Sequence, residues 1–318
     1  MASQPEIWAY SEKPILLGEL LGGARVLAEK LSGRVIAVIV GPHTIAEDAI
    51  KMGAEKVYWL GDIETRLVED YVPTLAELLK EYKPAILLIG NTKRGKAIAG
   101  RVAARLGASA MIDVKDFIPS ASGVSTRHMI FGGGAVREEK PQTDTLIATV
   151  GLGNFENADT DANRSGEIIA VPFIKPEWKA KLLGRKEKKV TSVNLAAAKR
   201  VVCVGRGLSK QEDLVMINEL AHLLEAEVGC TRPLAEGLDW LPRERYIGVS
   251  GAFIKPDLYL GIGVSGQVQH TVGITDSRVI VGINKDKDAA IFSQADYGIV
   301  GDLYAVVPAL ISALKARK

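Results

Sequence analysis

One glycine-punctuated stretch limits the fold of this chain more than any other part of it. The apolar run 258–262 leads into Gly261-x-Gly263-x-x-Gly266, and a second apolar run, 279–283, follows. This order is typical of a strand, a glycine turn, the start of a helix and the next strand. Such turns leave backbone N–H groups free to hold a pyrophosphate. The spacing alone is weak evidence for a nucleotide, because many glycine-rich turns hold none.

The residue after the second apolar run bears on which nucleotide is expected. A fold that binds NAD should place Asp or Glu there, about 20 residues after the glycines, to hold the ribose hydroxyls. This chain has Asn284 at that position. Gly273 and the pair Asp276-Ser277 also interrupt the helix after roughly two turns. An NAD-binding enzyme of a related doubly wound fold is therefore an alternative with reduced support.

Length and composition restrict the class of protein. A chain of 318 residues is longer than a single hydrophobic core usually supports, which predicts two domains. A net charge of +2 provides no electrostatic footprint for nucleic acid. No apolar run reaches the ~20 residues that cross a bilayer, so we expect no membrane insertion. Two cysteines, Cys203 and Cys230, and no export signal or Arg-rich presequence predict a reducing compartment, the cytoplasm.

The first half alternates apolar, β-branched runs with helical patterns, which predicts a mostly parallel sheet covered on both faces. The strands are expected at 7–10, 34–40, 56–60 and 85–90, and the helices at 18–30, 44–52, 74–82 and 93–106. Short alternating segments then predict appended antiparallel strands at 113–117, 123–130, 135–137 and 145–150. Segment 172–190 has little periodicity and is expected to wrap or link, so we place the domains at 1–190 and 191–318.

The second half is again strand, turn and helix. Its strands are expected at 200–204, 226–229, 246–249, 258–262, 278–283 and 298–300, and its helices at 210–225 and 303–316. The predicted fold class is therefore α/β, with two mostly parallel, doubly wound sheets, the second of them Rossmann-like. In open parallel sheets, ligands bind beyond the carboxyl ends of the strands, so the residues just past these ends can line one cleft.

Five segments of the second half carry a family resemblance. They are Val201-Val202-Cys203-Val204-Gly205-Arg206-Gly207, Val228-Gly229-Cys230-Thr231-Arg232, Tyr246-Ile247-Gly248-Val249-Ser250-Gly251, Ser265-Gly266-Gln267-Val268-Gln269-His270 with the later Ile283-Asn284, and Ala295-Asp296-Tyr297-Gly298-Ile299-Val300-Gly301-Asp302. In this order they resemble the signature of the electron transfer flavoprotein α subunit. The resemblance implies an electron carrier that binds FAD, with no catalytic residue and no metal site of its own. The sequence contains no metal-spaced Cys/His cluster, no P-loop motif and no nucleophile elbow.

The resemblance assigns cofactor contacts to residues at the strand ends. They are Thr231, Arg232, Ser250, Gly251, Ser265, Gly266, Gln267, Val268, Gln269, His270, Asn284 and Asp302. Ser265 with the amides of 266–268 is expected to hold the pyrophosphate, Gln269 the ribityl chain, and Asn284 with Asp302 the adenosine. Asp302 also suits the N-cap of the last helix, and both roles are compatible.

Three of these residues are expected near the flavin ring. In similar proteins Arg232 lies over the ring, where its permanent charge favours the reduced anionic forms. His270 resembles the residue that hydrogen-bonds the flavin C2 carbonyl, and Ser250 the hydroxyl that donates to N5. From the residues alone, Arg232 is a surface arginine at a turn and His270 a structural histidine. Many relatives have Ser in place of Thr231 and Ala-Ala-Val-Asp in place of Pro233-Leu234-Ala235-Glu236.

The resemblance also implies partners. These are a β subunit that carries AMP or a second FAD, flavin dehydrogenases such as those of fatty acid β-oxidation as electron donors, and a quinone oxidoreductase or another acceptor. Whether such a heterodimer bifurcates electrons stays open at this point. A non-catalytic adenine-nucleotide sensor, suggested by the βα alternation of the first half, is a third hypothesis.

Overall fold

The computed structural model describes residues 4–63, 66–120, 123–131, 134–178, 180–184 and 195–317. The chain forms two compact units, one of residues 1–130 and 136–187 and the other of residues 131–135 and 188–318. The boundary expected between residues 190 and 191 lies outside the described residues. Each unit has its own sheet and its own core.

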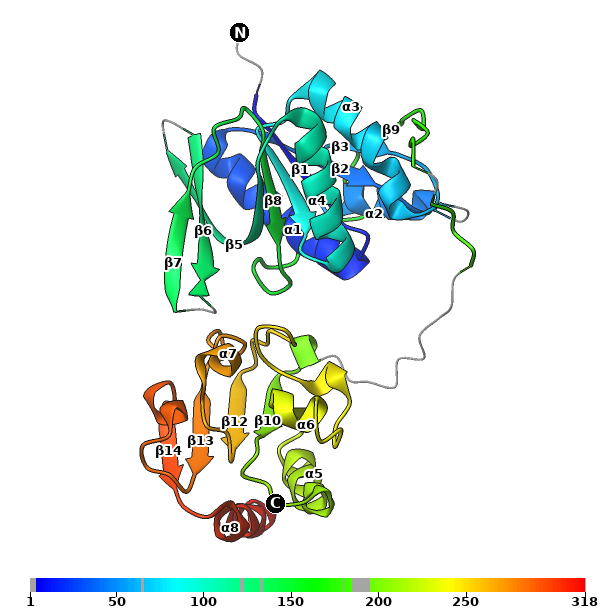
Figure 1. The fold of residues 1–318 in the computed structure, drawn as a ribbon. Helices are drawn as coiled ribbons and strands as arrows, with labels where there is room; N and C mark the ends of the chain where they lie inside the picture. The colour runs from blue at the N-terminus through cyan, green and yellow to red at the C-terminus, as the bar shows by residue number, and fades with distance from the viewer. Residues whose placement is uncertain are drawn as a thin grey trace. The chain divides into compact units, whose positions relative to one another are not determined.

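The first unit is built on a nine-stranded sheet of order β7-β6-β5-β8-β4-β1-β2-β3-β9 (Figure 1). Its elements are β1 (Glu6–Tyr10), α1 (Pro14–Leu31), β2 (Arg34–Ile39), α2 (His43–Lys51), β3 (Lys56–Trp59), α3 (Val72–Tyr82), β4 (Ile86–Gly90), α4 (Lys93–Leu106), β5 (Ala110–Ser120), β6 (Gly123–Ile130), β7 (Ala135–Glu139), β8 (Leu146–Val150) and β9 (Glu167–Ala170). Apolar residues of α1 and α2 bury one face of the sheet, and those of α3 and α4 bury the other. The expected parallel, two-sided arrangement is confirmed.

Two strands of this unit differ from the sequence-based expectation. β8 was expected to be antiparallel, but it pairs in parallel with both β4 and β5. All five of its residues are buried, as is typical of a central parallel strand, and its short length concealed this. β9 was not expected at all, because its four half-exposed residues at the edge beside β3 carry a weak pattern.

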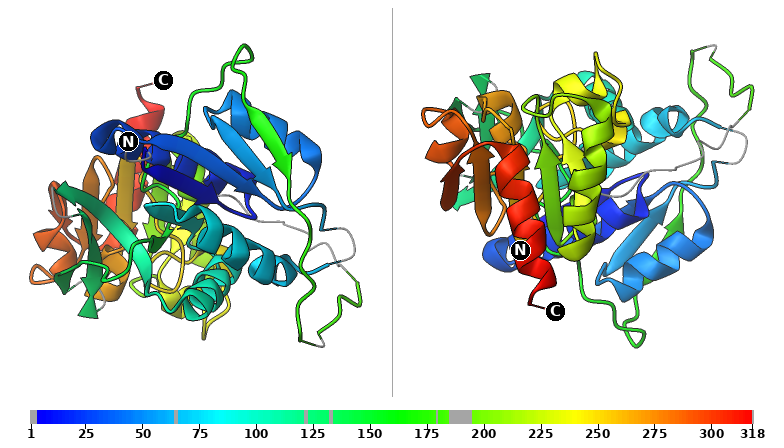
Figure 2. Two further views of the ribbon diagram at one scale, coloured as in Figure 1. Left: turned by 90° about the horizontal axis from the view of Figure 1, so that it is seen from above. Right: turned by 90° about the horizontal axis from the view of Figure 1, so that it is seen from below.

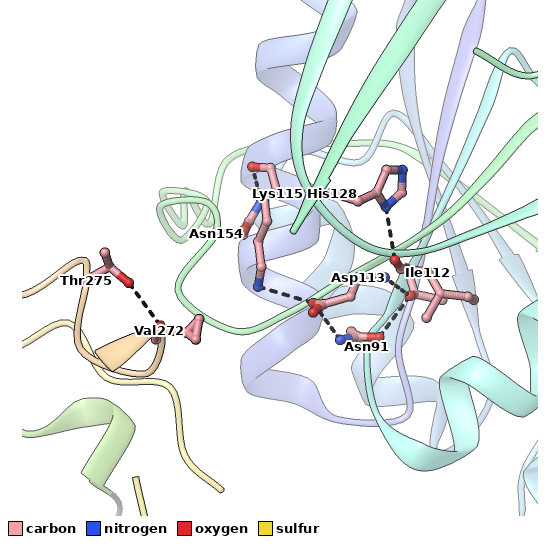
Figure 3. A network of polar contacts seen from close by, with 9 residues as sticks. Asn91, Ile112, Asp113, Lys115, His128, Asn154, Val272 and Thr275 are labelled. Carbon is pink, nitrogen blue, oxygen red and sulfur yellow. Dashed lines mark hydrogen bonds and ion pairs between the residues drawn. The ribbon is translucent and has the colours of Figure 1, made fainter. Parts of the chain in front are cut away.

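The appended antiparallel strand begins at a bulge in β5, where the register shifts after Met111. Asp113 adopts a left-handed conformation there, with φ of +58°. Its carboxylate accepts a hydrogen bond of 2.8 Å from the Asn91 amide and lies 3.2 Å from the Lys115 ammonium (Figure 3). These contacts stabilise the bulge, at which β5 leaves β8 and pairs antiparallel with β6.

The segment expected to wrap or link, 172–190, contacts the first unit at two of its described residues. The backbone N–H of Ile174 donates to Thr74 Oγ1 on α3 at 2.9 Å. The Trp178 indole N–H donates to Asp70 at the same distance.

The second unit is a five-stranded parallel sheet of order β11-β10-β12-β13-β14. Its elements are β10 (Arg200–Val204), α5 (Leu214–Leu223), β11 (Glu227–Cys230), α6 (Arg232–Ala235), β12 (Leu258–Ile262), α7 (Val268–Thr271), β13 (Ile280–Asn284), β14 (Tyr297–Val300) and α8 (Leu303–Lys315). α5 and α8 lie side by side on one face (Figure 2). Loop segments near Ile247, Val264 and Ile274 cover the other. The winding reverses between β10 and β12, which makes their carboxyl ends a switch point.

The prediction of a strand at 246–249 is wrong. Only isolated bridges form there, between Cys230 and Tyr246 and between Ile247 and Ala252. The chain turns at Gly248, whose φ of +141° is open to glycine and strained for other residues. In neither unit does a described helix have the length and apolar character that a membrane span requires.

Candidate functional site

A cavity of about 1100 Å³ opens at the carboxyl edge of the second sheet. It lies at the switch point, where the strand order predicts a ligand. Nine of the twelve predicted site residues line it: Thr231, Arg232, Ser250, Ser265, Gln267, Gln269, His270, Asn284 and Asp302. Gly251, Gly266 and Val268 are not among the lining residues. The volume slightly exceeds the ~300–1,000 Å³ that is typical of small-molecule sites, which suits a large ligand such as a dinucleotide.

Sequence reasoning missed part of the lining. The loop Gly205-Arg206-Gly207 after β10, Lys285 after β13, and the hydroxyl-bearing Ser209 and Tyr304 all line the cavity. The signal was present in one case, because Gly-x-Gly directly after a strand is the same kind of turn as Gly261-x-Gly263.

The glycines bring the loops of the cavity together backbone to backbone. A Cβ on Gly263, which has φ of +61°, would lie 2.8 Å from the Cα of Gly207. A Cβ on Gly266 would lie 2.1 Å from the backbone nitrogen of Ile291, and one on Gly251 would lie 2.3 Å from the Tyr246 carbonyl oxygen. The close approach of neighbouring backbone therefore explains why these positions require glycine. It also explains why Gly251 and Gly266 shape the cavity without lining it.

The charge of the lining favours an anion. Arg206, Arg232 and Lys285 are basic, and among the described lining residues Asp302 is the one acidic side chain. α7 contains a single turn, so its dipole is small and adds little to this attraction. The positive surplus therefore comes from side chains, and it suits a ligand with several negative charges.

His270 is buried beside the cavity with both ring nitrogens engaged. Nδ1 lies 2.9 Å from the carbonyl oxygen of Ile247, which can only accept, so Nδ1 carries the hydrogen. Nε2 then accepts from the Tyr259 hydroxyl at 2.7 Å. Burial lowers the pKa of His270 to about 4, so the ring is neutral at pH 7. In this state Nε2 has no hydrogen to donate to the flavin carbonyl that the sequence resemblance assigned to it.

Arg232 begins α6 and is held by a carboxylate. Its Nε donates to Glu236 Oε2 at 2.8 Å, and the Nε of Arg243 forms an ion pair with Glu236 Oε1 at 3.0 Å. The hydrogen bond and the charge of Glu236 raise the pKa of Arg232. The Arg232 side chain is 64% exposed, so another molecule has access to it.

Asn284 and Asp302 fix two walls of the cavity. The Asn284 amide donates to the Val264 carbonyl at 2.9 Å, which joins the end of β13 to the loop after β12. Asp302 accepts from the backbone N–H of Tyr304 at 3.0 Å and caps α8, as its position predicted.

Comparisons with known proteins agree with this architecture. Residues 194–275 match the model of the electron transfer flavoprotein FAD-binding domain, and residues 17–176 match that of the electron transfer flavoprotein domain. The putative electron transfer flavoprotein subunit YdiR of Escherichia coli K12 is 42% identical over 315 residues, which is 99% of each chain. Protein FixB of Escherichia coli O157:H7 and of Shigella flexneri is 37% identical over 311 residues, which is 97% of this chain and 98% of each relative.

The FAD-binding model covers the β10 to α7 part of the cavity, including the glycine turn whose spacing had left NAD as an alternative. The cofactor is therefore FAD. The lining fits this cofactor, because the cavity is large and its charge surplus matches a pyrophosphate. The chain belongs to the electron transfer flavoprotein family, as a member of its FAD-binding α-subunit branch and an electron carrier.

Proposed function

We propose that this chain is the α subunit of a heterodimeric electron transfer flavoprotein that holds FAD in the cavity at the carboxyl edge of the second sheet. It takes electrons from flavin dehydrogenases, those of fatty acid β-oxidation among them, and passes them to a quinone oxidoreductase or another acceptor. The observation that carries the proposal is the convergence of nine predicted residues from separate loops on one cavity. FAD supplies the redox chemistry when it is bound, and the protein binds and tunes it.

The positions around the cavity divide the proposed contacts into two groups. Arg206 and Lys285 line the cavity and bring positive charge to it, and the backbone N–H groups of 265–268 are the proposed donors to the pyrophosphate. Asn284 and Asp302, at the ends of β13 and β14, are proposed to hold the adenosine.

The remaining lining residues are proposed to contact the flavin and its ribityl chain. They are Thr231, Arg232, Ser250, Gln267, Gln269 and His270, and Gly251 and Val268 adjoin them in the sequence. The proposed role of Arg232 is electrostatic, because its permanent charge favours a ring that gains negative charge on reduction.

The proposed partner is a β subunit that carries AMP or a second FAD. The exposure of Arg232 supports this proposal, because a residue that tunes a flavin must be shielded from solvent to act strongly, and a second polypeptide provides that shield. We place the complex in the cytoplasm, which suits the two free buried cysteines, Cys203 and Cys230.

Coexpression with a β subunit tests the proposal. The purified complex should be yellow and release FAD on denaturation. One flavin per heterodimer indicates a simple carrier, whereas two indicate a pair that is equipped to bifurcate. A colourless complex, or one that releases NAD, contradicts the proposal.

A matched pair of variants locates the site. Arg206→Gln removes a charge from the cavity after β10, and Arg200→Gln removes the same charge from the exposed amino end of that strand. Loss of one charged phosphate contact should weaken FAD binding by about tenfold or more in Arg206→Gln. Binding should be unchanged in Arg200→Gln. Equal affinities of the two variants would place the cofactor elsewhere.

A further inference from the structure

The carboxylate of Glu236 is shared by two arginines, Arg232, which lines the cavity, and Arg243. One oxygen accepts a hydrogen bond from Arg232 at 2.8 Å, and the other forms an ion pair with the Nε of Arg243 at 3.0 Å. Glu236 is the least exposed of the three side chains, at 27%, against 64% for Arg232 and 66% for Arg243. The carboxylate is therefore the fixed centre of the group, and the two guanidinium groups are arranged around it.

The backbone holds this centre in place. The N–H of Glu236 donates to the Arg232 carbonyl at 2.7 Å and closes the single turn of α6. The N–H groups of Trp240 and Leu241 both donate to the carbonyl of Leu234, which is fully buried. The loop that carries Glu236 and leads to Arg243 is thus tied back onto α6. A closed loop presents its charges with little loss of conformational entropy.

The net charge of the group is +1, because one carboxylate partly cancels two guanidinium groups. A ligand beside Arg232 therefore experiences the fields of all three charges, each weakened by its own distance, and not that of Arg232 alone. Removal of Glu236 raises the net charge to +2, and removal of Arg243 lowers it to zero. The two changes act on the same site with opposite sign.

We propose that Glu236 is a positioning residue for Arg232 and that Glu236 and Arg243 together set the electrostatic potential at the flavin side of the cavity. This inference rests on the proposed function, because it takes FAD as the ligand beside Arg232. The negative charge of Glu236 weakens the preference of the site for the reduced cofactor. The positive charge of Arg243 strengthens that preference.

The test compares Glu236→Gln with Arg243→Gln in the complex with its β subunit. Glutamine at position 236 keeps an acceptor oxygen for the Arg232 Nε–H, so the pose of Arg232 is retained while the charge changes. We expect the ratio of affinities for reduced and oxidised FAD to rise about threefold in Glu236→Gln and to fall about threefold in Arg243→Gln. For a one-electron couple, threefold is ~30 mV in the potential. Arg200→Gln, which removes a charge at the far end of β10, should leave the potential unchanged.

The signs decide the outcome. Potentials that move in opposite directions support the inference. Potentials that move together, as general loosening of α6 would cause, overturn it, and so do potentials that do not move.

A readout without FAD separates this inference from the proposed function. In the cofactor-free complex with ¹⁵N-labelled arginine, Glu236→Gln should shift the Nε–H signals of Arg232 and Arg243 together. If neither signal shifts, Glu236 does not hold both arginines, and the inference is contradicted. A parent complex that binds no FAD overturns the proposed function, while the NMR signals still decide whether Glu236 holds both arginines.

Discussion

Acidification should destabilise the second unit through His270. Burial lowers the pKa of this side chain from its ordinary value of 6.5 to about 4. Between these two values the unfolded chain binds a proton at this position and the folded chain does not. The free energy of unfolding therefore falls as the pH is lowered from about 6.5 to about 4, and it is fully retained above 6.5. Since one pKa unit is worth about 1.36 kcal/mol, the whole loss is about 3 kcal/mol, of which about 2 kcal/mol is lost by pH 5.

Native-state hydrogen exchange measures this loss in the right part of the molecule. Protection of amides in β10 and β12 is followed in FAD-free protein at pH 7.5, 6.5, 5.5 and 4.5 and corrected for intrinsic exchange rates. The protection free energy of the parent should fall across the lower three values. His270→Gln should be less stable at pH 7.5, because it disrupts a buried hydrogen-bonded ring. Between pH 7.5 and pH 4.5, however, its free energy of unfolding should fall by about 2.5 kcal/mol less than that of the parent.

His222→Gln is the control for this experiment. His222 lies on the exposed side of α5, so its removal should leave the parent's pH dependence intact. A His270→Gln variant with the same slope as the parent would show that another group is responsible. A neutral, buried His270 would then not account for the parent's loss of stability at low pH.

Further substitutions test the packing around the cavity and in the first unit. Tyr259→Phe removes the donor to Nε2 of His270 and should lower the free energy of urea unfolding by about 1–3 kcal/mol; unchanged stability would contradict the hydrogen bond. Gly266→Ala places a Cβ 2.1 Å from the Ile291 nitrogen at a φ of +82° and should cost about 2–4 kcal/mol in the same assay. Gly100→Ala, where no atom lies within 4 Å of the added carbon, should instead stabilise α4 by about 0.5–1 kcal/mol. Equal responses to the two glycine substitutions would refute the packing argument.

The elements that the sequence predicted well are those with a strong local signal. The strands from β1 to β4 are continuous apolar runs separated by amphipathic helices, and both features are visible within windows of a few residues. The errors fall where the outcome depends on a distant partner. β8 is parallel because β4 and β5 lie on either side of it, and no residue within β8 specifies that neighbourhood. The run at 246–249 has strand-like residues, but its partner in β11 ends at Cys230.

The candidate site also has features that a local signal predicts and features that depend on distant residues. Its location was predictable, because the rule that ligands bind beyond the carboxyl ends of parallel strands needs only the strand ends. The chemical state of its residues was not. The neutral ring of His270 results from the Ile247 carbonyl and the Tyr259 hydroxyl, which lie 23 and 11 positions away in the sequence. Arg232 and Arg243 share the carboxylate of Glu236. This shared contact depends on a loop whose backbone is hydrogen-bonded to α6.

Three of the polar side chains at this cavity already have partners within the protein. Asn284 is bonded to the Val264 carbonyl, Asp302 caps α8 and Arg232 pairs with Glu236. Each contact holds a loop in position, so ligand binding does not have to order these side chains. Carboxylates, amides and guanidinium groups have more hydrogen-bonding positions than these contacts use, whereas a neutral imidazole has only two. Both ring nitrogens of His270 are therefore already hydrogen-bonded, and a ligand that needs a donor from this ring must compete with Tyr259 for Nε2.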